Sequence, residues 1–259
     1  MRKIGAMLLK ELRVVFTTPV AYVAYTVFTL VSSFFFLRLL SAFQRRVVEA
    51  TQMRPQDLRY LNFTDGVLQP LFYDVAVIFV FIVPFLTMRL IAEERRSNTF
   101  ELLMANPISP AQITLGKYLA ALVQIAVMVL LVGIYPLLVD AYAIEGGPEW
   151  ASVATGMLGL FLLGAAFCAV GLFISALTDS QVVAAAITFC ALLLLWVVGW
   201  AAADNSGATR DVLEAMSAIE HIRSFTRGVI DLQDTVYYLS LAGLGLFMTR
   251  QALEAARFR

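Results

Sequence analysis

Long apolar runs separated by short polar segments are the main pattern of this sequence. Six runs approach the roughly 20 residues that an α-helix needs to cross the hydrocarbon core of a bilayer. The pattern therefore predicts an all-α integral membrane protein with six transmembrane helices. The second run contains Pro84, which membrane helices tolerate, and the sixth run is short. The expected spans are Val20–Leu40, Leu71–Leu90, Lys117–Val139, Ser152–Leu177, Val182–Ala203 and Thr235–Thr249.

Two segments outside these runs also have helical spacing. In residues 1–18, apolar side chains such as Met7 gather near one face, and Lys10 and Glu11 lie on the other. This spacing predicts an N-terminal amphipathic interfacial helix, which Pro19 ends or turns into the first span. Residues 204–234 are too short and too charged to cross and return. We expect one or two short membrane-dipping helices there, before the last span.

The composition agrees with a chain that lies mainly in lipid. Its 259 residues are 60% hydrophobic and 15% charged, whereas soluble domains carry about a quarter charged residues. Six spans and their connections use the available length, so we expect a single transmembrane domain over 1–259. The formal net charge is zero and no long basic block is present, which argues against nucleic acid as a partner. The bilayer is the expected surrounding.

The distribution of Lys and Arg predicts the orientation of the chain. Basic residues near span ends are retained in the cytoplasm. With the N-terminus inside, segments 1–19, 89–117, 178–181 and 250–259 hold eleven basic and six acidic residues. The outer side then has seven basic and thirteen acidic residues, with Arg38 at the end of the first span. We therefore expect both termini in the cytoplasm and the segment 204–234 outside it.

The chain lacks the residue patterns of common membrane enzymes. His221 is the only histidine, which excludes an H-E-x-x-H zinc site and any histidine-rich metal cluster. No G-x-S-x-G elbow occurs. Residues 111–118 resemble a nucleotide-binding loop only superficially, because Ala111 replaces its first glycine and Tyr118 follows the lysine. We expect no catalytic, metal or cofactor site, and charge-poor spans disfavour a proton-driven carrier.

The connection between the second and third spans, residues 93–116, carries the strongest functional pattern. Ser97 or Asn98 can cap a short helix, and Asn106-Pro107 and Ser109-Pro110 would end it. Gln112–Tyr118 then restarts a helix into the third span. Such an amphipathic helix could receive a push from a cytoplasmic partner, although a solvated loop with turn prolines fits equally well. The candidate residues are Glu93, Glu94, Arg95, Arg96, Ser97, Asn98, Thr99, Phe100, Glu101, Leu102, Leu103 and Met104.

This segment resembles the permease subunits of type-two ABC transporters. Their pattern, E-x-x-x-x-T-x-E-x-L-L…P-[IV]-S…G-K, matches the run from Glu94 through Thr99 to Gly116-Lys117, with Asn98 where the family usually has glycine. The resemblance implies that 93–116 holds the coupling helix, which fits a groove on a separate ATPase subunit. It also implies that ATP and Mg are bound by that partner, so this chain would have no cofactor of its own.

A second patch is similar to the gliding-motility-associated (GldF-like) permeases. The chain carries their E-H-x-x-x-F-x-R-G-V-[IL]-D core in residues 220–231. This resemblance implies an auxiliary subunit with a large extracytoplasmic domain. The residues that could contact such a partner or line an outer gate are Glu220, His221, Phe225, Arg227 and Asp231. A histidine satisfied within the fold and a helix-capping aspartate are simpler interpretations of His221 and Asp231.

The sequence therefore predicts a permease subunit in the cytoplasmic (inner) membrane of a bacterium. An ABC ATPase subunit and a second permease copy or paralogue would complete a complex for export or mechanical signalling. Small residues such as Gly164, Ala165 and Cys168 could pack within one subunit or between two. The alternatives are a membrane scaffold and a transporter subunit that is not coupled to ATP.

Overall fold

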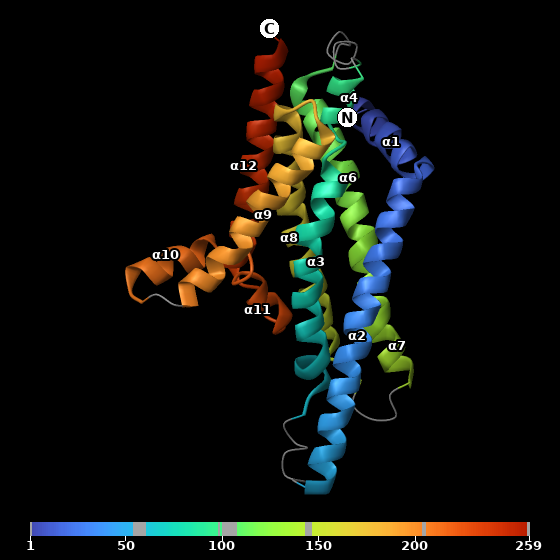
Figure 1. The fold of residues 1–259 in the computed structure, drawn as a ribbon, viewed down its shortest axis with the longest axis vertical. Helices are drawn as coiled ribbons and strands as arrows, with labels where there is room; N and C mark the ends of the chain where they lie inside the picture. Colours follow the sequence, from blue (N-terminus) through green and yellow to red (C-terminus); the bar gives the residue numbers. More distant parts are fainter. Residues whose placement is uncertain are drawn as a thin grey trace.

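The computed structural model describes residues 2–53, 61–97, 99, 108–142, 147–203 and 206–257. Within these residues all regular structure is helical, and the elements run along one long axis (Figure 1). The predicted all-α class is therefore confirmed for the described part of the chain. The elements are α1 (Arg2–Thr17), α2 (Pro19–Met53), the π-helix η2 (Thr64–Leu68), α3 (Gln69–Thr87), α4 (Ala92–Arg96), α6 (Pro110–Val132), α7 (Ile134–Tyr142), α8 (Trp150–Leu177), α9 (Gln181–Ala203), α10 (Ala208–Met216), α11 (Ile222–Thr226) and α12 (Leu232–Arg257).

Five stretches of the described residues are long and apolar enough to cross a membrane. The two in α8 and α9 match predicted runs closely, and two others, 64–96 and 110–142, contain the runs expected at 71–90 and 117–139 but extend beyond them. The first, in α2, continues to Met53, beyond the expected end at Leu40. The sixth predicted span lies in α12, which is 26 residues long but less apolar than the other five. Its uncharged part, 235–249, is short and includes Tyr237 and Tyr238. The crossing by α12 therefore remains a prediction.

The start of the chain forms the helix that its amphipathic pattern predicts. Helix α1 ends at Thr17, and the chain bends at Thr18 before Pro19 begins α2. Figure 1 shows α1 crossing the upper part of the molecule while α2 runs down its side. At about 1.5 Å per residue, the 35 residues of α2 span about 50 Å. The helix is thus longer than a bilayer core of about 30 Å requires.

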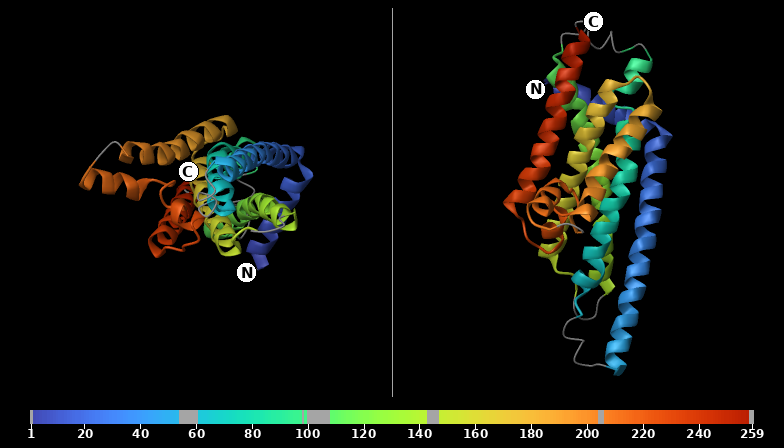
Figure 2. Two further views of the ribbon diagram at one scale, coloured as in Figure 1. Left: turned by 90° about the horizontal axis from the view of Figure 1, so that it is seen from below. Right: turned by 60° about the vertical axis from the view of Figure 1, so that its left-hand side comes forward.

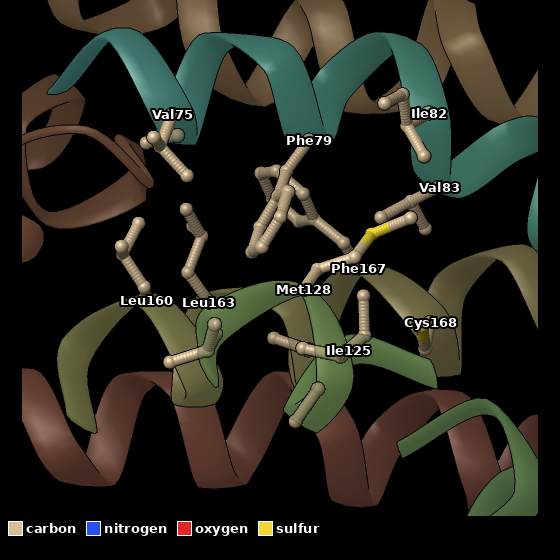
Figure 3. Packing of buried hydrophobic residues seen from close by; sticks show 14 of the residues in the cluster. Val75, Phe79, Ile82, Val83, Ile125, Met128, Leu160, Leu163, Phe167 and Cys168 are labelled. Atoms are coloured by element: carbon tan, nitrogen blue, oxygen red, sulfur yellow. The ribbon is translucent and has the colours of Figure 1, made fainter. Parts of the chain in front are cut away.

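The core lies between α3, α6, α8 and α12. Figure 3 shows Phe79 of α3, Ile125 and Met128 of α6, and Leu163 and Phe167 of α8 facing one another. All five side chains are fully buried. Helix α12 packs along α8, which gives the most extensive contact between any two helices of the described chain. The central position of α8 explains why its polar residues can hold other helices in place.

Small residues on α8 allow this close packing. A Cβ atom added to Gly164 would lie 2.6 Å from Ile125 Cγ2, so no larger side chain fits there without movement. Ala165 and Cys168 are 7% and 0% exposed, respectively. This patch therefore packs within one chain and leaves no surface for contact with a second copy.

Both termini lie at the same end of the molecule as α4, as the two side views show (Figures 1 and 2). Helices α2 and α6 run away from that end, and α3 and α8 return to it. The predicted functional segment is therefore close to the start of the chain in space. The segment that holds α10 and α11 lies at the side of the molecule, lower than α4.

Candidate functional site

The end of α3 is separated from α4 by a turn that one serine of α8 stabilises. The Ser175 hydroxyl accepts hydrogen bonds from the backbone N–H groups of Ile91 and Ala92, both at 3.1 Å, and donates to the Met88 carbonyl at 3.2 Å. Ser175 is fully buried. Because a buried backbone group without a partner is costly, this serine stabilises the start of α4, whose N-cap is Ile91. It also ties the turn to α8.

Helix α4 contains the first four candidate residues, Glu93 to Arg96, and Ser97 follows it. The Thr99 backbone N–H donates to the Glu94 carbonyl at 3.1 Å, and the Ser97 and Thr99 hydroxyls are 2.9 Å apart. The remaining candidates lie outside the described residues, as do the apolar contacts predicted for them. These are Asn98, Phe100, Glu101, Leu102, Leu103 and Met104.

The connection ends and α6 begins near the predicted position. Ser109 is the N-cap of α6, and its hydroxyl accepts from the Gln112 N–H at 3.3 Å. The Gln112 side chain accepts from the Ser109 N–H in return, which completes a capping box. Pro110 occupies the first turn, where its missing N–H is tolerated. The predicted restart of a helix near Gln112 is therefore confirmed.

A charge cluster with three largely buried members, Glu11, Glu94 and Lys117, and a half-exposed Lys10 joins α4 to two other helices. Lys117 of α6 is 1% exposed, and its Nζ lies 3.0 Å from Glu11 Oε1 of α1 and 3.1 Å from Glu94 Oε1 of α4. Lys10 of α1 also donates to Glu94 Oε1 at 2.9 Å. We call these four residues, Lys10, Glu11, Glu94 and Lys117, the inner charge cluster. Two acids and two bases make it neutral overall.

The electrostatics of the inner charge cluster favour its intact form. Burial lowers the pKa of Lys10, but the hydrogen bond and charge of Glu94, assisted by Glu11, outweigh it and raise this pKa above its usual value. Removing one member of a buried ion pair typically costs about 3–5 kcal/mol, because the other charge is left without compensation. The cluster therefore opposes separation of α4 from α1 and α6.

Sequence reasoning found Glu94 but missed the rest of the cluster. The sequence places Lys117 in the G-K of the permease pattern and in a superficial nucleotide-binding loop, without predicting an ion pair. The prediction that Glu11 lies on the polar face of α1 is wrong, because Glu11 is buried against Lys117. The sequence feature that could have indicated this contact is the Gly116-Lys117 pair, because glycine allows another helix to approach beside the lysine. A Cβ atom on Gly116 would lie 2.7 Å from Met7 Cγ. Gly116 thus lets α1 approach α6 closely enough for Lys117 to reach Glu11.

Two further ion pairs surround α4. Arg95 Nη1 lies 3.6 Å from Asp179 Oδ1, in the connection between α8 and α9. Arg89 Nε lies 4.0 Å from Glu93 Oε2, one helical turn away. Both pairs are partly solvent-exposed, and such pairs contribute only about 0–1 kcal/mol each. These exposed pairs add little stability, so α4 is attached to the other helices mainly by the inner charge cluster and Ser175.

The residues predicted for an outer partner divide into buried and exposed groups. His221 is 5% exposed: its Nδ1 lies 2.6 Å from Asp234 Oδ1 and its Nε2 lies 3.2 Å from the Ala215 carbonyl. Ser224 donates to the other Asp234 oxygen. Each ring nitrogen thus has an oxygen within hydrogen-bond distance, so His221 has its polar partners within its own chain. We call His221, Ser224 and Asp234 the outer cluster.

The other outer candidates have simple structural partners. Phe225 is fully buried against α8, where a Cβ atom on Gly159 would lie 2.6 Å from it. Glu220 pairs with Arg223 at 3.2 Å. Asp231 is exposed, and its Oδ1 accepts from the Gln233 N–H at the start of α12. Arg227 is exposed. Within this chain, only Arg227 and Asp231 of the five present an open surface.

The fold and site together describe a polytopic helical membrane protein in which buried charges connect α4 to α1 and α6. A family comparison adds the class: the sequence model of the ABC-2 family transporter proteins matches residues 6–225. This match covers most of the 259 residues, and the chain belongs to that family. It is therefore a membrane permease component of the ABC transporter type, a class that is generally not catalytic itself. A search of curated proteins gave no match.

Proposed function

We propose that this chain couples ATP hydrolysis by a separate ATPase subunit to export or to mechanical signalling across the cytoplasmic membrane. In this proposal α12 is the sixth crossing and both termini are cytoplasmic. The segment 93–116 receives the movement of the ATPase, which itself binds ATP and Mg. The observation that carries the proposal is the inner charge cluster, because it fastens α4 to two helices that are far away in the sequence.

The contacts of α4 offer three routes for movement. Glu94 would pull α1 through Lys10, and α6 through Lys117. The Ser175 hydroxyl would transmit motion of the preceding turn to α8. Rigid helices can carry such displacements over their whole length. A push on the loop would therefore move α1, α6 and α8 together instead of only bending the loop.

The complex would contain a second permease copy or paralogue. An auxiliary subunit with a large extracytoplasmic domain is the further partner suggested by the likeness to gliding-motility-associated permeases. For that contact Arg227 and Asp231 are the better candidates, because they are exposed while His221 and Phe225 are buried. Glu220 lies at intermediate exposure beside them.

The test is co-expression with a candidate ABC ATPase subunit. A double variant that combines Glu94→Lys with Leu102→Asp should reduce ATPase stimulation to the level of the ATPase alone. Glu94→Lys places a third base beside Lys10 and Lys117, and Leu102→Asp removes apolar contact from the proposed coupling helix. Glu254→Lys is the matched charge reversal, since Glu254 pairs with Arg250 on the exposed side of α12. Unchanged ATPase binding and stimulation in the double variant would refute the proposal.

The alternative is a membrane scaffold or a subunit that works without ATP. It predicts purification without any nucleotide-binding protein and, for a transporter, activity in vesicles that lack ATP. The braced loop favours the ATP-coupled function, because a scaffold has no need for a rigid connection between α4 and α1.

A further inference from the structure

A cavity of about 290 Å³ lies beside the inner charge cluster, between the bend that joins α1 to α2, the end of α3, and α6. Its apolar walls include Val14, Val20 and Phe85, and Gln124 adds a polar group. Three charged residues also line it: Glu11, Arg89 and Glu93. A volume near the lower limit of small-molecule pockets suits a headgroup better than a whole lipid.

The depth of the cavity matches the headgroup region of a bilayer. No charged residue occurs between Asp74 and Arg89, so Arg89 is the first charge after the apolar part of α3. Charged side chains at such ends lie at the interface between hydrocarbon and water. The bend between α1 and α2 lies near the same end of the molecule as α4 (Figure 1). Val20 and Phe85 are 40% and 58% exposed, so the apolar wall continues onto the outer surface.

The charged residues that line the cavity can pair with both charges of a zwitterionic ligand. Glu11 is already neutralised by Lys117 at 3.0 Å. Arg89 and Glu93 are less well satisfied: their closest atoms are 4.0 Å apart, and Arg89 Nε is buried without a hydrogen-bond partner among the described residues. Buried donors of this kind normally have a partner. One guanidinium and one carboxylate side by side offer sites for a phosphate and an ammonium group.

We propose that this cavity binds the headgroup of a zwitterionic phospholipid with a primary ammonium group, such as phosphatidylethanolamine. Its phosphate accepts hydrogen bonds from Arg89, and its ammonium donates to Glu93. Its acyl chains extend over the exposed surface at Val20 and Phe85. A choline headgroup has no N–H donor for Glu93, and a glycerol headgroup has no positive charge. The bound lipid would fill the space between the α1–α2 bend and α3.

The test is a lipid titration of the purified full chain followed by native mass spectrometry. Phosphatidylethanolamine, phosphatidylcholine and phosphatidylglycerol with identical acyl chains are compared. We expect phosphatidylethanolamine to bind about tenfold more tightly than either of the others, the gain of one charge-assisted hydrogen bond. Equal binding of the three lipids, or preference for phosphatidylglycerol, would overturn the proposal. Water-soluble glycerophosphoethanolamine should compete poorly, and competition at equal concentration would identify a soluble ligand instead.

Two variants separate the roles of the charged residues. Glu93→Gln should bring phosphatidylethanolamine to the level of phosphatidylcholine, and Arg89→Gln should weaken both. The matched control is the exposed pair Arg250 and Glu254, which has the same i,i+4 spacing in α12. Arg250→Gln and Glu254→Gln should leave lipid selectivity unchanged. If Arg89→Gln does not fold, Glu93→Gln alone tests the proposal, because Glu93 is half-exposed. Retained preference for phosphatidylethanolamine in Glu93→Gln would contradict the proposed headgroup site.

Discussion

The inner charge cluster and the outer cluster are both largely buried groups of polar side chains, but the residues that they join lie at different distances along the chain. In the inner cluster, Lys117 meets Glu11 across 106 positions and Lys10 meets Glu94 across 84. In the outer cluster, His221 and Asp234 are only 13 positions apart. The first therefore fixes how distant helices are arranged. The second ties the nearby α10 and α11 to the first turn of α12.

We therefore expect the inner charge cluster to affect coupling to the ATPase and the outer cluster to affect only the stability of the fold. Loss of an inner contact should free α4 from α1 or α6 and change what happens when a partner moves the loop. Loss of an outer contact should loosen α10 and α11 against α12 without affecting α4. Thermal unfolding and ATPase stimulation, measured on the same variants, can therefore test the comparison.

The largest effect is expected for Lys117→Met. It leaves Glu11 and Glu94 buried with only Lys10 to compensate them, and such losses cost about 3–5 kcal/mol. We expect a strongly lowered unfolding temperature in detergent and loss of ATPase stimulation. The double variant Glu11→Gln with Lys117→Met should recover part of the stability, because it removes one of the two uncompensated acids. A Lys117→Met variant as stable as the original chain would contradict the buried cluster.

A smaller effect is expected for Gly116→Val. The added side chain would meet Met7 at under 3 Å and would push α1 away from α6, which costs about 1–3 kcal/mol for overpacking. ATPase stimulation should fall because Lys117 loses Glu11. Met7→Ala in the same chain should restore both properties, which distinguishes crowding from a general defect of the helix.

The outer cluster should behave differently. In His221→Leu, Asp234 keeps Ser224 but loses the contact with the imidazole, and the Ala215 carbonyl loses it too, so we expect a loss of about 1–3 kcal/mol in stability. ATPase stimulation should persist in whatever fraction remains folded. Loss of stimulation in folded His221→Leu protein would show that the two clusters are not independent.

The smallest effect on stability is expected for Asp179→Asn. Its contact with Arg95 is 3.6 Å long and the aspartate is 74% exposed, so the expected change is below about 1 kcal/mol. ATPase stimulation should decrease slightly, because α4 loses one contact with the α8–α9 connection. A change in unfolding temperature as large as that of Lys117→Met would invalidate the distinction between buried and exposed pairs.

Much of the fold could be predicted because apolar length and helical period are local properties. The spans near 71–90, 152–177 and 182–203 and the helix at 1–18 needed no knowledge of neighbours. A membrane crossing by α12 is harder to predict, since its apolar stretch between Asp234 and Arg250 is short. Hydropathy places the end of the first span at Leu40, but α2 continues to Met53, because the polar residues after Leu40 extend the helix without adding hydrophobicity.

The candidate site was only partly predictable for the same physical reason. Spacing around Glu94 identified the loop, and Ser109-Pro110 identified its exit. Nothing local distinguishes Lys117 from an ordinary lysine at a span end, or Ser175 from a packing serine. Their roles depend on residues of other helices, and a single sequence carries no record of those distances.

By itself the sequence determined that the chain is helical and lies in a membrane, because length and hydropathy act along the chain. It also predicted a functional segment between the second and third spans from the placement of charges and prolines. Only the tertiary structure decided which charges are buried together. Gly116 lets α1 approach α6, and Lys117 Nζ then lies 3.0 Å from Glu11 and 3.1 Å from Glu94, distances at which opposite charges in a low dielectric hold helices together.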